Sequence, residues 1–246
     1  MIRLSIIIPI YNVEQYLERC LISLIDQDIK SYEYELICVN DGSPDKSRDI
    51  VIRFQEEHPN IILIDQENQG VSRARNNGID KAKGNYILFI DPDDYIESNS
   101  LGRILKIAEG KEVEVLFLGF TFLEENGKTR EKIFYDAFQS FEYTGIEAYS
   151  ISRGDGETDA DRINAVLFKR DFLNRNNLRF LPDVPYLEDG EFMVRILCVA
   201  HKCYFEGNSF YQRTTRPGSA TNSDLFYTER ASKGFILAAS NQNLPK

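Results

Sequence analysis

The first 115 residues alternate short apolar runs with segments whose apolar positions recur every three or four residues. Continuous apolar runs bounded by polar turns predict buried strands, and they occupy residues 4–10, 34–40, 61–65 and 86–90. Between the strands, helical spacing is found at Tyr16, Leu17, Cys20, Leu21, Leu24 and Ile25, and after the start signal Ser43-Pro44-Asp45 at Ile50, Val51 and Phe54. This order predicts an α/β fold with a mainly parallel central sheet flanked by helices.

The second half of the chain alternates less clearly. Residues 115–122 and 133–141 predict further strands, Gly154-Asp155-Gly156 predicts a loop, and a helix opens near Leu187 and continues through Leu197. We find no linker composition and no internal repeat along the sequence. Residues 1–246 are therefore expected to form a single domain, in which the second half completes the sheet.

Polar residues follow each of the first four predicted strands. Ligands of parallel α/β sheets bind at the carboxyl ends of the strands, where the strand order reverses. The four segments at these ends are Pro9-Ile10-Tyr11-Asn12, Asn40-Asp41-Gly42-Ser43, Asn68-Gln69-Gly70-Val71-Ser72 and Asp91-Pro92-Asp93-Asp94. We expect them to converge on one rim of the sheet.

The segment 91–94 carries three carboxylates within four residues, directly after an apolar strand. Such carboxylates repel one another, and a divalent cation with oxygen ligands relieves the repulsion. A metal there would also neutralise a diphosphate and act as a Lewis acid for a leaving group. The alternative is a helix N-cap before Leu101, which Asp94 in particular could supply. The residues alone leave both interpretations open.

Asp41 and the segment after Gly70 suggest recognition of a nucleotide. A carboxylate at a strand end can accept an N–H of a base or ribose hydroxyls, although Asp-Gly also forms Asx turns readily, and taken alone the turn is favoured. Arg73 and Arg75 lie in the first turns of the predicted helix after Gly70, where helix amides and guanidinium groups bind anions. A solvated basic helix face is the alternative, but the acidic strand end opposite disfavours it.

Two later motifs also allow both a structural and a functional interpretation. Glu188 and Asp189 open a helix, where local evidence favours capping, although paired acids facing a cleft can include a general base. Residues 211–219 contain two arginines and several hydroxyls on a predicted loop, which either closes over phosphates or is exposed.

Composition narrows the function classes. With 42% hydrophobic and 28% charged residues the chain is a globular protein. Its net charge of −10 excludes broad binding to nucleic acid, which needs a basic face. No apolar run reaches the ~20 residues of a membrane span, and no signal peptide is recognised. Cys20, Cys38, Cys198 and Cys203 form no C-x-x-C pair, so we expect reduced structural thiols; with His201 the last two make only half a zinc site.

Together and in this order, the motifs resemble those of the inverting family 2 glycosyltransferases with the GT-A fold. The resemblance covers most of the chain and rests on 9–12, 40–43, 68–78, the Asp-x-Asp of Asp91 and Asp93, Glu188-Asp189, and Arg213 with Ser219. It implies a Rossmann-like nucleotide-sugar-binding half at 1–115 and an acceptor-binding half at 116–246. Side chains that choose the sugar are expected from the second half.

The resemblance also implies roles for individual residues and a UDP-sugar donor. Pro9 and Tyr11 would pack around the base, Asp41 would accept its N–H, and Asn68 and Arg75 would line the nucleotide pocket. Asp91 would approach ribose or diphosphate, and Asp93 would coordinate Mn²⁺ or Mg²⁺. Asp189, with Glu188 beside it, would deprotonate the acceptor, while Arg213 and Ser219 would stabilise the departing diphosphate. Relatives with a metal-binding His in the late motif differ, since this chain has only His58 and His201.

The expected activity is therefore transfer of a sugar, with inversion, to a hydroxyl of a glycan or lipid-linked saccharide. Surface polysaccharide biosynthesis in the cytoplasm, with membrane association at most peripheral, is the expected setting. A nucleotidyltransferase should have a glycine-rich basic loop after the first strand, which Pro9-Ile10-Tyr11-Asn12 is not. A glycoside hydrolase using Glu188 and Asp189 would leave the nucleotide-like strand ends unexplained, and a non-catalytic sugar-binding or scaffold protein would not need the three site aspartates.

Overall fold

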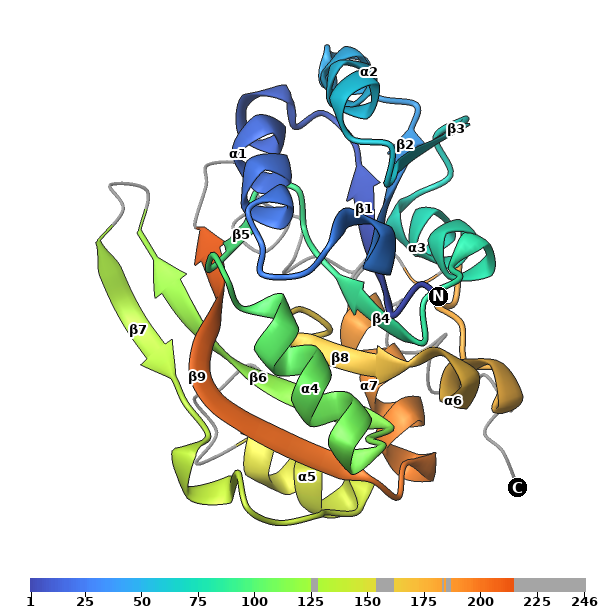
Figure 1. Cartoon of the computed structure of the whole chain (residues 1–246). Helices are drawn as coiled ribbons and strands as arrows, with labels where there is room; N and C mark the ends of the chain where they lie inside the picture. The colour runs from blue at the N-terminus through green and yellow to red at the C-terminus, as the bar shows by residue number, and fades with distance from the viewer. Residues whose placement is uncertain (125–127, 154–161, 183, 185–186, 215–246) are drawn as a thin grey trace.

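A computed structural model describes residues 1–124, 128–153, 162–182, 184 and 187–214 (Figure 1). Its centre is a nine-stranded mixed sheet, in which β7 pairs with β6 beside the strand order β3-β2-β1-β4-β8-β6-β9-β5. The first half contributes the parallel part of this sheet. Its strands are β1 (Leu4–Ile10), β2 (Tyr34–Asp41), β3 (Ile61–Gln66) and β4 (Tyr86–Phe89).

The predicted elements of the first half are confirmed to within one residue at the strand ends. Every residue of β1 and β2 is buried, as expected for continuous apolar runs covered by helices on both faces. The connecting helices are α1 (Glu14–Ile25), α2 (Ser47–Glu57) and α3 (Val71–Lys81), with a short 3-10 turn η1 (Ser31–Glu33) before β2.

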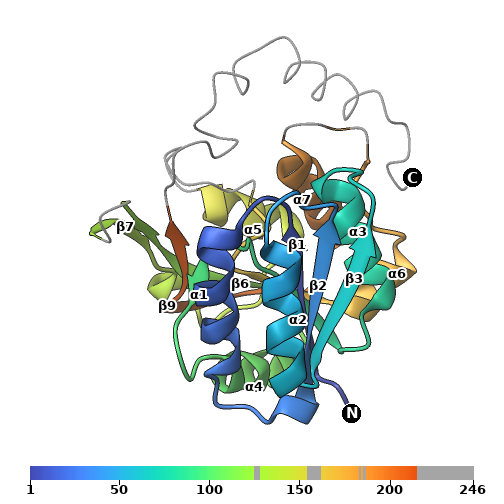
Figure 2. The same ribbon diagram turned by 90° about the horizontal axis from the view of Figure 1, so that it is seen from above.

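The strand order reverses direction at β1. The chain moves outward from β1 to β2 and β3, and then returns to the other side of β1 to form β4. Right-handed crossovers therefore place α1 and α2 on one face of the sheet and α3 on the other, as Figure 2 shows. The neighbouring strands β1 and β4 lie at this switch point, and ligands of α/β sheets bind beyond the carboxyl ends of the strands there.

The segment Ser43-Pro44-Asp45, which predicted a helix start, contributes hydrogen bonds to the starts of both α1 and α2. The Asp45 carboxylate accepts hydrogen bonds from the amides of Ser47, 3.0 Å away, and of Glu14, 2.8 Å away. In return, the Glu14 carboxylate accepts the amide of Lys46 at 2.8 Å. The first turns of α1 and α2 thus satisfy each other's unpaired amides, and this fixes the loops after β1 and β2.

The second half extends the same sheet. β8 pairs antiparallel with β4 through three residue pairs, Tyr86 with Lys169, Ile87 with Phe168 and Leu88 with Leu167. β6 then pairs with β8, and β9 runs parallel to β6 and ends beside β5. These elements are β5 (Tyr95–Ile96), α4 (Leu101–Lys111), β6 (Val115–Leu123), β7 (Thr129–Ile133), η2 (Asp136–Phe138), α5 (Gly145–Arg153), β8 (Val166–Lys169), α6 (Arg170–Arg175), α7 (Glu188–Val199) and β9 (Cys203–Thr214). Within the described ranges, every helix is too short or too polar to cross a bilayer.

The predicted strand at 133–141 is wrong. β7 ends at Ile133, and the chain then turns into η2. Tyr135 and Phe138 do not alternate between two faces; both rings pack on Phe205, at centroid distances of 4.8 and 6.0 Å. Packing around one aromatic ring therefore overrides the strand preference of these residues. The predicted loop at 154–156 lies outside the described residues.

Helix α3 lies unusually close to β1 at Gly78. A Cβ at this position would lie 2.4 Å from Ile7 Cγ2, and Ile7 is fully buried in the centre of the sheet. Only glycine permits this approach, which sets the depth of the helix against the strand.

We expect Gly78→Ala to lower the free energy of unfolding by about 1–3 kcal/mol, because the added methyl group overpacks the buried Ile7. Gly110→Ala in α4 is the matched control, since a Cβ there meets nothing within 4 Å. The control should leave stability unchanged or raise it by up to about 1 kcal/mol. Urea unfolding of both variants measures the difference, and equal stabilities would contradict the proposed close approach.

Candidate active site

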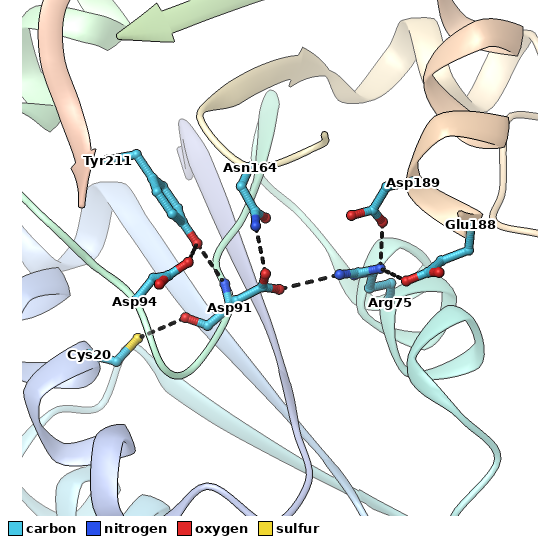
Figure 3. Close-up of polar contacts among 8 residues, drawn as sticks. All are labelled: Cys20, Arg75, Asp91, Asp94, Asn164, Glu188, Asp189 and Tyr211. Atoms are coloured by element: carbon cyan, nitrogen blue, oxygen red, sulfur yellow. Dashed lines mark hydrogen bonds and ion pairs between the residues drawn. The ribbon is translucent and has the colours of Figure 1, made fainter. Parts of the chain in front are cut away.

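Arg75 is the centre of a carboxylate cluster at the rim of the sheet (Figure 3). It lies on α3, and its side chain is 4% exposed. One terminal nitrogen, Nη1, donates to Asp189 Oδ1 at 2.7 Å and to Glu188 Oε1 at 3.1 Å. The other, Nη2, donates to Asp91 Oδ1 at 3.3 Å. Carboxylates from the end of β4 and from the start of α7 therefore meet at one guanidinium.

The electrostatics of this cluster keep Arg75 charged. Burial on its own lowers the pKa of Arg75, but the negative charges of Asp189, Asp91 and Glu188 outweigh burial and raise the pKa above its ordinary value. The ring of Phe180 lies under the guanidinium, 5.2 Å from it. One positive charge faces three carboxylates, so the cluster retains negative charge that attracts a cation.

Asp91 is held from three directions. Besides Arg75 on Oδ1, its Oδ2 accepts a hydrogen bond from Asn164 Nδ2 at 2.6 Å. Its backbone N–H donates to the hydroxyl of Tyr211 at 3.1 Å. The Asp91 side chain is still 29% exposed, so it faces an open side of the site. Sequence reasoning missed Asn164, which belongs to no motif and to no periodic pattern. Tyr211 opens the late segment 211–219, but no role was predicted for it.

Asp94 has a structural role, and it is not the helix N-cap before Leu101 that was one of the two interpretations of this segment. Ser100 precedes α4, and its side chain makes no capping bond. Asp94 is buried, and it accepts hydrogen bonds from the hydroxyl of Tyr211 and from the amide of Thr214, each at 2.7 Å. Burial, together with the charges of nearby carboxylates, raises the pKa of Asp94 well above its ordinary value. These bonds fasten the end of β9 to the loop after β4.

The acidic cluster of the loop fits a divalent cation. Asp91, Asp93 and Asp94 each offer a ligand atom, and these atoms lie within 4.8 Å of one another. Carboxylate oxygens are the ligands that Mg²⁺ and Mn²⁺ prefer. Both oxygens of Asp94 already accept hydrogen bonds, one from the hydroxyl of Tyr211 and one from the amide of Thr214. Arg19 holds the loop from outside by donating to the Asp93 carbonyl oxygen at 2.6 Å.

Asp41 organises the neighbouring strand end. Its Oδ1 accepts hydrogen bonds from the amide of Gln69 at 2.8 Å and from Gln66 Nε2 at 2.7 Å, and its Oδ2 accepts the amide of Gly70 at 2.9 Å. These bonds of Asp41 all go to residues 66–70, so they form no Asx turn; the neighbouring Asn40 Oδ1 accepts the amide of Ser43, three residues on, at 3.1 Å. Asp41 therefore holds the loop that leads into α3.

The other predicted nucleotide residues lie at the same rim. Pro9 is buried in β1, and Tyr11, just after that strand, is 49% exposed. Asn68 is exposed, and its amide nitrogen would lie 2.9 Å from a Cβ on Gly42, whose φ is +66°. Glycine at 42 therefore allows the loops after β2 and β3 to approach each other.

Glu188 and Asp189 are not capping residues. The residue before α7 is Leu187, in a left-handed conformation with φ 62°, and no side chain caps the helix. The two carboxylates contact Arg75 instead. The predicted loop at 211–219 is wrong at its start, because residues 211–214 form the end of β9 and pair with β6. In this strand the guanidinium of Arg213 lies 5.2 Å from the ring centre of Phe122, and Ser219 lies outside the described residues.

The cysteines are free thiols, as expected. Burial raises the pKa of Cys38 to about 12. Burial and the charge of Glu114 raise the pKa of Cys203 to about 12 as well. Thiols with such a pKa are unreactive at neutral pH. Within the ranges that the structure describes, residues 91–94 supply the acidic group able to hold a metal, and Cys198, His201 and Cys203 form no such group.

Two solved structures illustrate the fold of this chain, which is of the GT-A type. S. aureus TarS 1-349 in complex with UDP-GlcNAc superposes with a TM-score of 0.79 at 24% identity, over 97% of this chain and 66% of that one. The mannosyltransferase PcManGT from Pyrobaculum calidifontis, in complex with GDP-Man and Mn²⁺, does so with a TM-score of 0.68 at 18% identity, over 99% and 66% of the two chains. The mixed sheet with its flanking helices is therefore a GT-A fold.

The sequence defines the family. Residues 5–172 match Glycosyl transferase family 2, and the chain belongs to this family. Glycosyltransferase GlyA of Streptococcus pneumoniae serotype 4 is 32% identical over 98% of this chain and 34% of its own length. The minor teichoic acid biosynthesis protein GgaB of Bacillus subtilis is 37% identical over 58% of this chain and 16% of its own length. The chain thus spans only a part of these curated relatives.

Replacing Arg75 tests whether it holds the cluster together. We expect Arg75→Met to lower the free energy of unfolding by about 3 kcal/mol, since three partly buried carboxylates lose their counter-charge. Arg73→Ala is the matched control, because Arg73 is exposed on the same helix and its loss changes the net charge equally. Chemical denaturation at neutral pH compares the two. A loss in Arg73→Ala as large as that in Arg75→Met would contradict a specific role for the cluster.

Proposed function

We propose that this protein transfers a sugar from a UDP-sugar to a hydroxyl of a glycan or lipid-linked saccharide, with inversion at the anomeric carbon. The observation that carries the proposal is the Arg75 cluster, which brings Asp189 and Glu188 to the carboxylate of Asp91. A general base and a donor-binding carboxylate must lie this close for a direct displacement. The complex of TarS with UDP-GlcNAc supports a uridine nucleotide as donor.

The donor nucleotide is assigned to the half formed by residues 1–115. In this proposal Tyr11 and Pro9 contact the base, and the exposed ring of Tyr11 at the end of β1 supports that role. Asp41 accepts an N–H of the base through the acceptor position of Oδ2 that its bonds to Gln66, Gln69 and Gly70 leave available. Asn68 completes the pocket beside Gly42, and the acceptor binds in the half formed by residues 116–246.

We assign a divalent cation, Mn²⁺ or Mg²⁺, to the loop after β4, with Asp93 as its ligand. When bound, such a cation neutralises the diphosphate and thereby makes it a better leaving group. The acidic cluster supports the assignment, as does the Mn²⁺ in the complex of PcManGT. Arg213 and Ser219 are assigned to the diphosphate as further positive and hydroxyl contacts.

In the proposed reaction, Asp189 accepts the proton of the acceptor hydroxyl. The hydroxyl oxygen attacks the anomeric carbon as the bond from that carbon to the diphosphate oxygen breaks, and UDP leaves with the electron pair. Arg75 fixes the orientation of Asp189 through the 2.7 Å contact. Glu188 binds the same guanidinium nitrogen at 3.1 Å and so restrains Arg75 in turn.

The proposed setting is the assembly of a surface polysaccharide. The similarity to GgaB, a minor teichoic acid biosynthesis protein, supports this class of product. We place the reaction in the cytoplasm, with peripheral membrane association at most.

Ligand-induced stabilisation tests the donor and the metal together. We expect UDP with Mn²⁺ to raise the melting temperature of the wild-type protein, since a ligand at 100 times its Kd stabilises by about 2.7 kcal/mol. Chelator should abolish the shift, and Asp93→Asn should lose most of it. Asp49→Asn, an exposed substitution on α2, is the control and should retain it. Failure of every nucleoside diphosphate to stabilise the wild-type protein would refute the donor site.

A second test addresses the base and the stereochemistry without knowledge of the acceptor. NMR follows hydrolysis of a bound UDP-sugar, in which water replaces the acceptor, and identifies the anomer released first. We expect the inverted anomer from the wild-type protein and a fall in turnover of about 10²–10⁴-fold in Asp189→Asn. Donor affinity should be unchanged. Glu188→Gln, which removes a charge from the same cluster, should lose less turnover, and normal turnover in Asp189→Asn would disprove the assignment of the base.

A further inference from the structure

Buried polar atoms without a partner gather around Asp91. Among the described residues, five buried side-chain atoms lack a hydrogen bond, and three of them lie at the rim of the site: Ser72 Oγ, Arg75 Nε and Asn164 Oδ1. Buried polar groups in proteins are nearly always paired, so such a group at a ligand site calls for a ligand. Asn164 is informative because it also binds Asp91 directly.

The orientation of the Asn164 carboxamide follows from chemistry. An ionised carboxylate can only accept hydrogen bonds, so the group 2.6 Å from Asp91 Oδ2 must be the amide nitrogen of Asn164. Its oxygen therefore points away from Asp91, and it is buried without a partner. Figure 3 shows this carboxamide beside Asp91, on the side of the site where Asp189 lies.

The backbone holds Asn164 in place. Its carbonyl oxygen accepts a hydrogen bond from Arg162 Nε at 3.1 Å, and Arg162 is itself packed 3.5 Å from the ring centre of Phe120. The next residue, Ala165, has φ +58°, a conformation that a non-glycine residue adopts only under constraint. Asn164 thus enters the site from the second half of the chain on a rigid support.

We propose that Asn164 binds the donor sugar, with its Oδ1 accepting a hydrogen bond from a hydroxyl of the sugar that is transferred. This inference rests on the proposed function, because it requires a nucleotide sugar beside Asp91. An unpaired acceptor oxygen selects a hydrogen-bond donor, and at neutral pH a diphosphate offers mainly acceptors whereas a sugar hydroxyl can donate. The partly exposed side chain of Asp91 supplies the open side from which a hydroxyl can reach the carboxamide.

The ratio of two affinities separates this role from a purely structural one. If Asn164 only positioned Asp91, its loss would weaken UDP and the UDP-sugar by the same factor. If its oxygen binds the sugar, the UDP-sugar loses more affinity than UDP. One hydrogen bond between neutral groups corresponds to about tenfold in affinity.

The experiment is isothermal titration of the whole chain with UDP and with UDP-GlcNAc, UDP-glucose and UDP-galactose, all in Mn²⁺. We expect Asn164→Ala to weaken the best-binding UDP-sugar about tenfold more than UDP. Asn60→Ala is the matched control, because Asn60 also carries a buried unpaired carboxamide atom but precedes β3 at the opposite end of the parallel strands. Asn164→Ser, which keeps a hydroxyl donor for Asp91, provides a second variant, and melting temperatures establish that each variant is folded.

Deoxygenated donors then identify the hydroxyl. For one deoxy UDP-sugar, the selective loss in Asn164→Ala should disappear, because the contacted hydroxyl is already absent. Equal weakening of UDP and UDP-sugar, or unchanged binding of both, would overturn the inference while leaving the proposed function intact. If the wild-type protein binds UDP but none of the UDP-sugars, the proposed function fails and the inference fails with it.

Discussion

The structure depends on one buried positive charge. The guanidinium of Arg75 neutralises carboxylates that arrive from β4 and from α7, and without it Asp91, Glu188 and Asp189 would repel one another. Other features place that guanidinium. The glycine at the contact with Ile7 sets the depth of α3, and the carboxylate of Asp41 ties down the loop from which α3 starts. Packing and hydrogen bonding thus position the guanidinium of Arg75, and its charge links the two halves of the chain.

Much of the first half could be predicted from sequence because its strands are covered on both faces. Such strands must be continuously apolar, so their ends are visible as the first polar residues, and those residues line the site. Around η2 the apolar pattern predicted a strand that the structure does not have. The rings of Tyr135 and Phe138 pack against Phe205, which lies far away in the sequence. The spacing of apolar residues along the chain does not reveal such a contact.

The charged residues of the Arg75 cluster could be named from sequence motifs, but their pairings could not. Motifs indicated Arg75 and Asp189, yet nothing local indicates that one would hold the other. The partner of Asp94 is Tyr211, more than a hundred residues later, so a local reading could suggest only a helix cap. Asn164 carries no signal in sequence, because a single asparagine before an apolar strand has many ordinary explanations; only its buried, half-satisfied carboxamide distinguishes it.

The seam between β4 and β8 has a consequence for how such chains diverge. Here the two halves pair through a short antiparallel ladder. Its hydrogen bonds are made by backbone groups, which are the same in every sequence. Substitutions and insertions beyond the seam can therefore accumulate while residues 1–115 keep their geometry. What must be inherited together across the seam is the set of acids that Arg75 requires. Recombination between relatives at this point would exchange the second half while preserving the fold of residues 1–115, provided that the incoming half brings its own pair of acids.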